Sequence, residues 1–463
     1  MAEAEDRFGC NLKQIFTLLL LLGYGYAMQA QTVSEPRVNI LVIVAENMPA
    51  AYMAPGPEKP VRTPAFDSLA AAGVWFSQVF LASADPLASR LSLLTGLYPW
   101  QASGAVPMTR TLREQGYYTG YLGTGLIPDN PAHRGADTLL GTYVARMDSG
   151  LLPRYDFAAS FRALLDTLPA GERFFCWAGL DVPAPAPGAG RRAEIDLKTL
   201  RPPAFWPDQY VVRNELADYL TTLEAQDRQL QALLDVLQER QLTTSTLVVF
   251  TAASGMPLPR AAGELYDYGV RVPLIICQPG QPGARYCDDL ISLTDLAPTL
   301  LEAAALKPPR TLPGTSLGPI LRRKKSGSLD KDRDAIVYAR DGNPDTCHAA
   351  YPARALRTRD WAYMHHYAAD QWPAGDPSCL PGQPALSETG ALMLRYQKQP
   401  DYRPAFEKTY GKRPAEELYR MADDRDQMRS LAADVSYVRV LSRHRKALRR
   451  FLRHTGDPYG KIK

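Results

Sequence analysis

The sequence of 463 residues lacks several features that would point to a particular function. Its formal net charge is only +4, so charge alone gives no argument for a nucleic-acid partner. None of its six cysteines shows the Cys-x-x-Cys spacing typical of zinc sites. Internal repeats and low-complexity tracts are also absent. What remains is an ordinary globular composition, 46% hydrophobic, in a chain long enough for one large and one smaller domain.

A long hydrophobic run is missing near the N-terminus as well. The apolar run from Ile15 to Tyr26 is shorter than the roughly 20 residues that a membrane-spanning helix needs. Lys13 precedes it and the small residue Ala30 closes it, which is the pattern of a secretory signal peptide. We therefore expect residues 1–30 to be a signal peptide and the protein to be secreted or periplasmic. A retained membrane anchor is the alternative.

Export would permit disulfide bonds among the cysteines that follow the signal peptide. We expect Cys277 to pair with Cys287, or Cys347 with Cys379, with an odd thiol left over. The alternative is that these cysteines are buried small hydrophobic residues.

Apolar runs alternate with helical patterns along the chain. Residues 37–47 form a nearly continuous apolar run that ends in polar residues, as a central parallel strand ends at its active-site edge. Residues 215–242 show leucines at helical spacing, and the buried strand Thr246–Ala252 follows at once. This alternation predicts an α/β fold around a large, mostly parallel sheet.

A polar, turn-rich stretch at 322–333 predicts a link between two domains. We place the larger domain at 37–322 and a smaller α+β domain at 334–458. The smaller domain is expected to end in a basic amphipathic helix at about 437–454, with leucines on one side and Arg and Lys opposite. Its basic side is either a solvated face or a supplement to the binding of an acidic glycan.

The stretch from Ser83 to Trp100 predicts a tight turn followed by a helix N-terminus, where orphan amide donors favour an anion or an ionised nucleophile. Its Ser89-Arg90 pair and the following Leu-Leu-Thr-Gly-Leu-Tyr-Pro resemble the nucleophile segment of the sulfatases. In that family a Cys or Ser, three residues before the conserved Ser-Arg pair, is oxidised to formylglycine. Here that position is Pro86, which has no side-chain heteroatom and can neither attack sulfur nor bind a metal.

The resemblance covers about residues 37–458 and places the chain in the alkaline phosphatase superfamily, nearest to the N-sulfoglucosamine sulfohydrolases, or heparan N-sulfatases. It implies an alkaline-phosphatase-like sandwich and a smaller C-terminal domain. The segments that carry the closer match are Arg201–Asp208, Tyr351–Thr358, Asp370–Pro377, Lys412–Tyr419 and Thr455–Pro458.

The family also implies a calcium ion, which needs a cage of several oxygen ligands. The positions that match the family's ligands are Glu46, Asn47, Pro86, Ala253 and Ser254. Only Glu46 brings a carboxylate, so the resemblance predicts that the calcium site is lost and that the protein has no cofactor.

The matched basic and proton-transfer positions are replaced too. Thr124, Leu126, Ala184 and Ala262 stand where the family has lysine or histidine, and Arg90 alone is kept, with Ser89 as local support. No histidine falls at a matched position. The pair His365-His366 is expected on a strand with the two rings facing opposite ways, which makes a poor metal clamp.

Three functions follow as hypotheses. The first is a catalytically inactive pseudosulfatase that binds a sulfated glycan or an active sulfatase partner. The second is an active sulfuric ester or sulfamate hydrolase with an altered centre built on Glu46, Asp85 and Arg90. The third is a purely structural interaction protein. For Arg90 the alternative to anion binding is pairing with a carboxylate at the helix start. Nucleic acid is not expected as a partner, and the oligomeric state is open.

Overall fold

The computed structural model describes residues 37–56, 59–123, 138–140, 156–182, 185, 187–281, 283–342, 350–379 and 387–461. The predicted signal peptide therefore lies outside the described residues. None of the helices that are described is long and apolar enough to cross a membrane. Residues Val38–Lys463 form one compact unit by their contacts, and the predicted division at 322–334 stays a prediction.

The larger sheet has eight strands in the order β4-β3-β5-β1-β6-β7-β2-β8. All of its pairings are parallel except those of β7, which runs antiparallel to β6 and β2. This confirms the predicted α/β class, and the wholly buried β1 is the central strand that its apolar run predicts. The bounds are β1 Asn39–Ala45, β2 Val74–Phe80, β3 Tyr117–Gly123, β4 Thr138–Leu140, β5 Arg173–Gly179, β6 Thr246–Ala252, β7 Leu274–Cys277 and β8 Arg285–Ser292.

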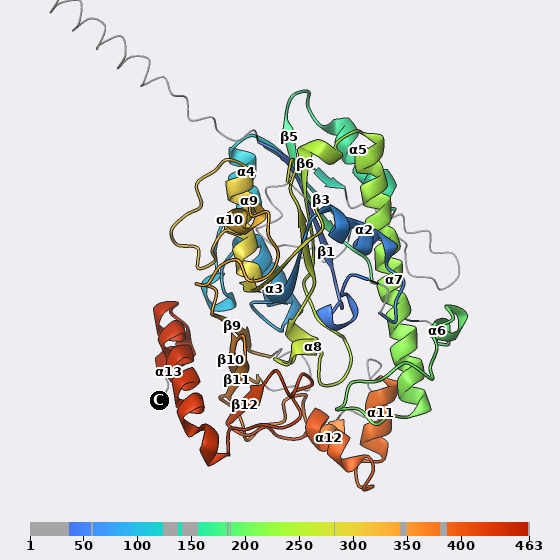
Figure 1. The fold of residues 1–463 in the computed structure, drawn as a ribbon, viewed down its shortest axis with the longest axis vertical. Coiled ribbons are helices and arrows are strands. Elements are labelled where there is room, and N and C mark those ends of the chain that lie inside the picture. Colours follow the sequence, from blue (N-terminus) through green and yellow to red (C-terminus); the bar gives the residue numbers. More distant parts are fainter. Residues whose placement is uncertain are drawn as a thin grey trace, which may run out of the picture. The chain divides into compact units, whose positions relative to one another are not determined.

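Helices cover both faces of this sheet (Figure 1). The long helix α7, expected at 215–242 and found at Tyr210–Glu239, packs with α2 and α5 on one face. The other face carries α3, α4, α9 and α10. The bounds are α2 Pro64–Ala72, α3 Pro86–Thr95, α4 Met108–Glu114, α5 Phe157–Thr167, α6 Ala189–Arg192, α8 Asp267–Val270, α9 Leu296–Ala303 and α10 Gly318–Leu321.

A second, antiparallel sheet follows in the order β12-β11-β10-β9. Helix α13 packs on β10 and β11. It is the basic helix that the sequence predicts at about 437–454. The two sheets are joined directly, because Ser83, just before α3, forms a parallel bridge with Ala339 of β9. The bounds are β9 Ala335–Arg340, β10 Ala353–Thr358, β11 Trp361–His366, β12 Glu416–Arg420, α11 Glu388–Arg395, α12 Arg403–Tyr410 and α13 Val438–His454.

A buried ion pair closes the C-terminal end of the chain onto the second sheet. The Arg354 side chain on β10 is 1% exposed, and its Nε donates to Asp457 Oδ2 at 2.7 Å, where the Asp457 side chain is 0% exposed. The guanidinium also lies over the rings of Trp100 and Tyr459. Two of the segments that resemble the N-sulfoglucosamine sulfohydrolases thus meet through one charge pair.

The predicted disulfide between Cys277 and Cys287 is wrong, because both are free thiols. Cys277 ends β7 and Cys287 lies in β8, and β2 runs between these two strands. Two strand spacings of about 4.8 Å separate the cysteines by more than the roughly 7 Å that a disulfide can bridge. Cys347 lies outside the described residues, so its pairing with Cys379 stays a prediction.

Candidate functional site

The candidate site lies where β1 and β6 end side by side. The two strands are parallel in register, with Ala45 opposite Ala252, so the residues after them meet at one sheet edge. Asn47 turns the chain there with a positive φ of 57°, a conformation that asparagine adopts more readily than most residues. The backbone N–H of Asn47 donates to Ser254 Oγ at 2.8 Å, and the backbone N–H of Met48 donates to the Ser254 carbonyl at 3.0 Å.

Glu46 is held at this edge by two side chains. Arg90 Nη1, from α3, donates to Glu46 Oε1 at 2.6 Å, and Ser254 Oγ donates to Glu46 Oε2 at 2.6 Å. The pair is mostly buried, since the side chains of Arg90 and Glu46 are 22% and 14% exposed. Both carboxylate oxygens are therefore engaged by groups of the protein itself. Of the two predictions for Arg90, the structure shows pairing with a carboxylate.

Two polar residues of α7 fix the backbone beneath this pair. The buried Gln226 amide group bonds the Glu46 backbone in both directions, accepting from its N–H at 3.2 Å and donating to its carbonyl at 3.1 Å. The Tyr219 hydroxyl donates to the Asn47 carbonyl at 2.7 Å. Burial and the neighbouring Tyr52 raise the pKa of Tyr219 well above its usual value, so its phenol keeps the proton that it donates.

Sequence reasoning missed Gln226 and Tyr219. Both lie on the side of α7 that the apolar stripe assigns to the core. A polar side chain that is buried in the core normally has a hydrogen-bond partner. The polar residues within the apolar stripe of α7 were therefore the sequence feature that could have identified these two.

The turn before α3 has the predicted form, a short turn and then a helix N-terminus. Its N-cap is Asp85, whose Oδ1 accepts from the amides of Leu87 at 3.0 Å and Ala88 at 3.1 Å. Pro86 is the first helical residue and is exposed, while Ser89 is buried in the first turn. The amides that would face an external anion are thus bonded by the protein's own carboxylate.

The oxygen donors gathered here do not fit a calcium ion. Pro86 and Ala253 have no side-chain oxygen, and the one carboxylate at the matched positions, Glu46, already bonds Arg90 and Ser254. Among the described residues, no group of three or more His, Cys, Asp or Glu is placed to hold a metal. A calcium site needs several carboxylate or carbonyl oxygens around one point. The absence of a calcium cofactor stays a prediction, and the donor set is the argument for it.

The remaining matched positions are those at which the sulfatases have lysine or histidine. Thr124, Leu126 and Ala184 lie outside the described residues, so their place is not tested. Ala262 is exposed in a turn. None of these adds a charged group to the Arg90–Glu46 pair.

The two adjacent histidines face opposite ways on β11, as predicted. His365 lies 3.8 Å from Glu416, and His366 is buried 3.4 Å from Glu417. Burial lowers the pKa of His365, although Glu416 opposes this shift. The two rings therefore serve separate carboxylates of β12 and form no shared clamp.

These features define a protein of the alkaline-phosphatase-like class, in which a mostly parallel sheet presents polar residues beside a helix N-terminus. Residues 38–306 match the family model described as Sulfatase, and residues 263–380 match the one described as N-sulphoglucosamine sulphohydrolase, C-terminal. The chain belongs to the sulfatase family.

Individual relatives are distant. An ulvan-active sulfatase of Formosa agariphila is 26% identical over 469 residues, covering 91% of this chain and 76% of that protein. Human N-sulphoglucosamine sulphohydrolase is 26% identical over 274 residues, covering 56% and 51% of the two chains.

Solved structures support the fold. BT4656 in complex with its substrate D-glucosamine-2-N,6-O-disulfate has a TM-score of 0.67 at 17% identity, covering 92% of this chain and 100% of that chain. The phosphonate monoester hydrolase of Agrobacterium radiobacter has a TM-score of 0.62 at 18% identity, covering 90% and 96%. The fold therefore does not by itself select the reaction.

Proposed function

We propose that this member of the sulfatase family is a pseudosulfatase, a protein that binds a sulfated glycan and does not hydrolyse it. The observation that carries the proposal is the contact between Arg90 and Glu46, in which a guanidinium bonds the one carboxylate at the matched metal positions. The Arg90 guanidinium thus neutralises the Glu46 carboxylate, to which a metal ion at this position would otherwise bind.

Hydrolysis of a sulfate ester needs a nucleophile at sulfur, a cation for the developing charge and an acid for the leaving group. Pro86 offers no atom for the first role. Asp85 is the nearest substitute, and its Oδ1 is bonded to two helix amides. Glu46 is the other carboxylate, and both of its oxygens are bonded by Arg90 and Ser254. Asp85 thus caps α3 through Oδ1, and Glu46 is bonded through both of its carboxylate oxygens.

The binding half of the proposal draws on the chemistry of the relatives. One is named for activity on ulvan, and another is solved with a disulfated glucosamine. We assign a sulfated glycan to this chain as its ligand, in preference to an active sulfatase partner or a scaffolding role, and we place the protein outside the cytoplasm.

Release of inorganic sulfate tests the proposal. The purified full chain is incubated with calcium and with aryl sulfates or heparin fragments, and free sulfate is measured by ion chromatography. An active sulfatase under the same conditions is the positive control. We expect no release above buffer. Turnover that disappears in both Glu46→Ala and Arg90→Ala, with folding intact, would instead establish the altered hydrolase centre.

A further inference from the structure

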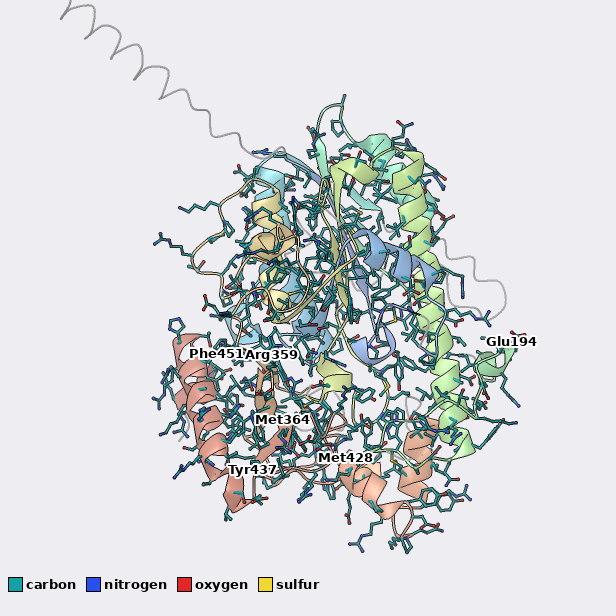
Figure 2. The ribbon with its side chains drawn as sticks, viewed as in Figure 1. Glu194, Arg359, Met364, Met428, Tyr437 and Phe451 are labelled. Carbon is teal, nitrogen blue, oxygen red and sulfur yellow. The ribbon has the colours of Figure 1, made fainter. Side chains whose placement is uncertain are left out.

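Positive charge is segregated on the last long helix, α13. Its 17 residues carry arginine, lysine and histidine but no Asp or Glu. Helix α7, in contrast, mixes both signs along its length. In Figure 2 α13 lies at the side of the second sheet, with Tyr437 labelled at its start and Phe451 near its end. The cations of α13 are Arg439, Arg443, Arg445, Lys446, Arg449, Arg450 and Arg453.

Four of these cations form one outward row, defined as Arg439, Arg443, Lys446 and Arg450. They follow one another at intervals of three or four residues, which places them on one face of the helix. All four are exposed, and within the described residues none makes an ion pair or a hydrogen bond through its side chain. At about 1.5 Å per residue the row is about 16 Å long. Like charges at this spacing destabilise a helix, so the row lowers the stability of α13 as long as no anion is bound to it.

The opposite side of α13 is fixed to the protein. Leu441, Leu448 and Leu452 are buried in a cluster with residues of the second sheet, among them Leu356 and Tyr363. The helix therefore cannot turn its apolar side toward a bilayer, and the row is held rigidly toward solvent. A fixed row of cations is suited to a linear polyanion.

An aromatic notch lies beside the row, between α13 and β11. The rings of Tyr367 and Tyr459 lie there tilted by 31° with their centroids 4.3 Å apart, and the His365 ring centroid lies 4.5 Å from that of Tyr367. Arg445 and Arg449 line the same notch. Arg445 is bonded to Glu416, with Nε donating to Oε1 at 2.7 Å, whereas Arg449 makes no ion pair within the described residues. Arg449, which precedes Arg450 of the row, thus adds a further cation beside it.

We propose that this row, with Arg449 beside it, is a binding site for a linear sulfated glycan, separate from the Arg90–Glu46 site. A guanidinium presents planar donors that match two oxygens of a sulfate group, and three guanidinium groups and the Lys446 ammonium follow one direction. The inference rests on the glycan-binding half of the proposed function and is independent of the loss of hydrolysis.

The test is binding of heparin to the full chain by isothermal titration calorimetry at two salt concentrations. The variant Arg443→Gln/Lys446→Gln/Arg450→Gln removes three cations while keeping good helix formers. Arg323→Gln/Lys324→Gln/Lys325→Gln, exposed between α10 and β9, is a matched control with the same change in charge. Arg90→Met probes the other site.

We expect heparin binding to weaken about 10- to 100-fold in the α13 variant and less than about threefold in the control and in Arg90→Met. The salt dependence should fall only in the α13 variant. Equal losses in the α13 variant and the control, or a loss only in Arg90→Met, would overturn the assignment to α13. Equal affinity for hyaluronate, DNA or anionic vesicles would overturn the sulfated glycan as its ligand. If the unaltered protein does not bind heparin, both glycan-binding proposals are wrong. The proposed lack of hydrolysis is then still judged by the sulfate-release experiment.

Discussion

Replacing Arg354 with methionine is expected to lower the free energy of unfolding by about 3–5 kcal/mol. The change leaves the carboxylate of Asp457, 0% exposed, without its cationic partner, and among the described residues only the Tyr459 amide still donates to it. Chemical denaturation followed by tryptophan fluorescence measures the change. The effect is large because an uncompensated buried charge retains its full desolvation cost.

Asp341 provides the matched control. It bonds the same guanidinium through Arg354 Nη1 at 2.8 Å, but its side chain is 51% exposed. Asp341→Asn should therefore cost less than about 1 kcal/mol. The double change Arg354→Met/Asp457→Leu should recover part of the loss, since it removes both charges. A cost below about 1 kcal/mol for Arg354→Met would contradict this account of how the C-terminal end is held.

A double-mutant cycle on Glu46→Gln and Arg90→Met is expected to give a coupling energy of about 1–3 kcal/mol. Each single change removes one partner and leaves the other charge mostly buried and unpaired, whereas the double change removes both charges. The stability of all four proteins is measured by urea unfolding. The exposed pair Arg162 and Glu239, in contact at 2.8 Å, is the control and should couple more weakly, because solvent screens exposed ion pairs. A coupling no larger than the control's would mean that the contact adds nothing to the fold.

Much of the candidate site could be predicted because it depends on strand ends. The parallel strands β1 and β6 bring Glu46, Asn47 and Ser254 together at one edge, and the first turns of α3 add Arg90. These positions follow from local patterns and from a family resemblance that fixes their order.

Contacts between distant segments could not be predicted in the same way. Gln226 reaches Glu46 across 180 residues, and Arg354 reaches Asp457 across 103. Nothing in the spacing of either pair identifies its partner. The disulfide predicted for Cys277 and Cys287 failed for a related reason, because nearness in sequence does not reveal that β2 lies between their strands.

The role of Asp85 also depended on local geometry. In the sequence Asp85 precedes Pro86 at the matched nucleophile position, which made it a candidate for the altered centre. In the structure its Oδ1 bonds the amides of Leu87 and Ala88. A proline at the first helical position supports this cap, since proline is favoured there.

The central claim, that the Arg90–Glu46 pair stands where the family has its metal centre, is tested most directly by calcium titration of the metal-free full chain. Thermal unfolding is followed with and without 1 mM calcium, about 100 times the dissociation constant of a 10 µM site, which would add about 2.7 kcal/mol. We predict no change in the midpoint and no bound calcium by calorimetry. Stoichiometric calcium, with a raised midpoint that Glu46→Gln abolishes, would contradict the account.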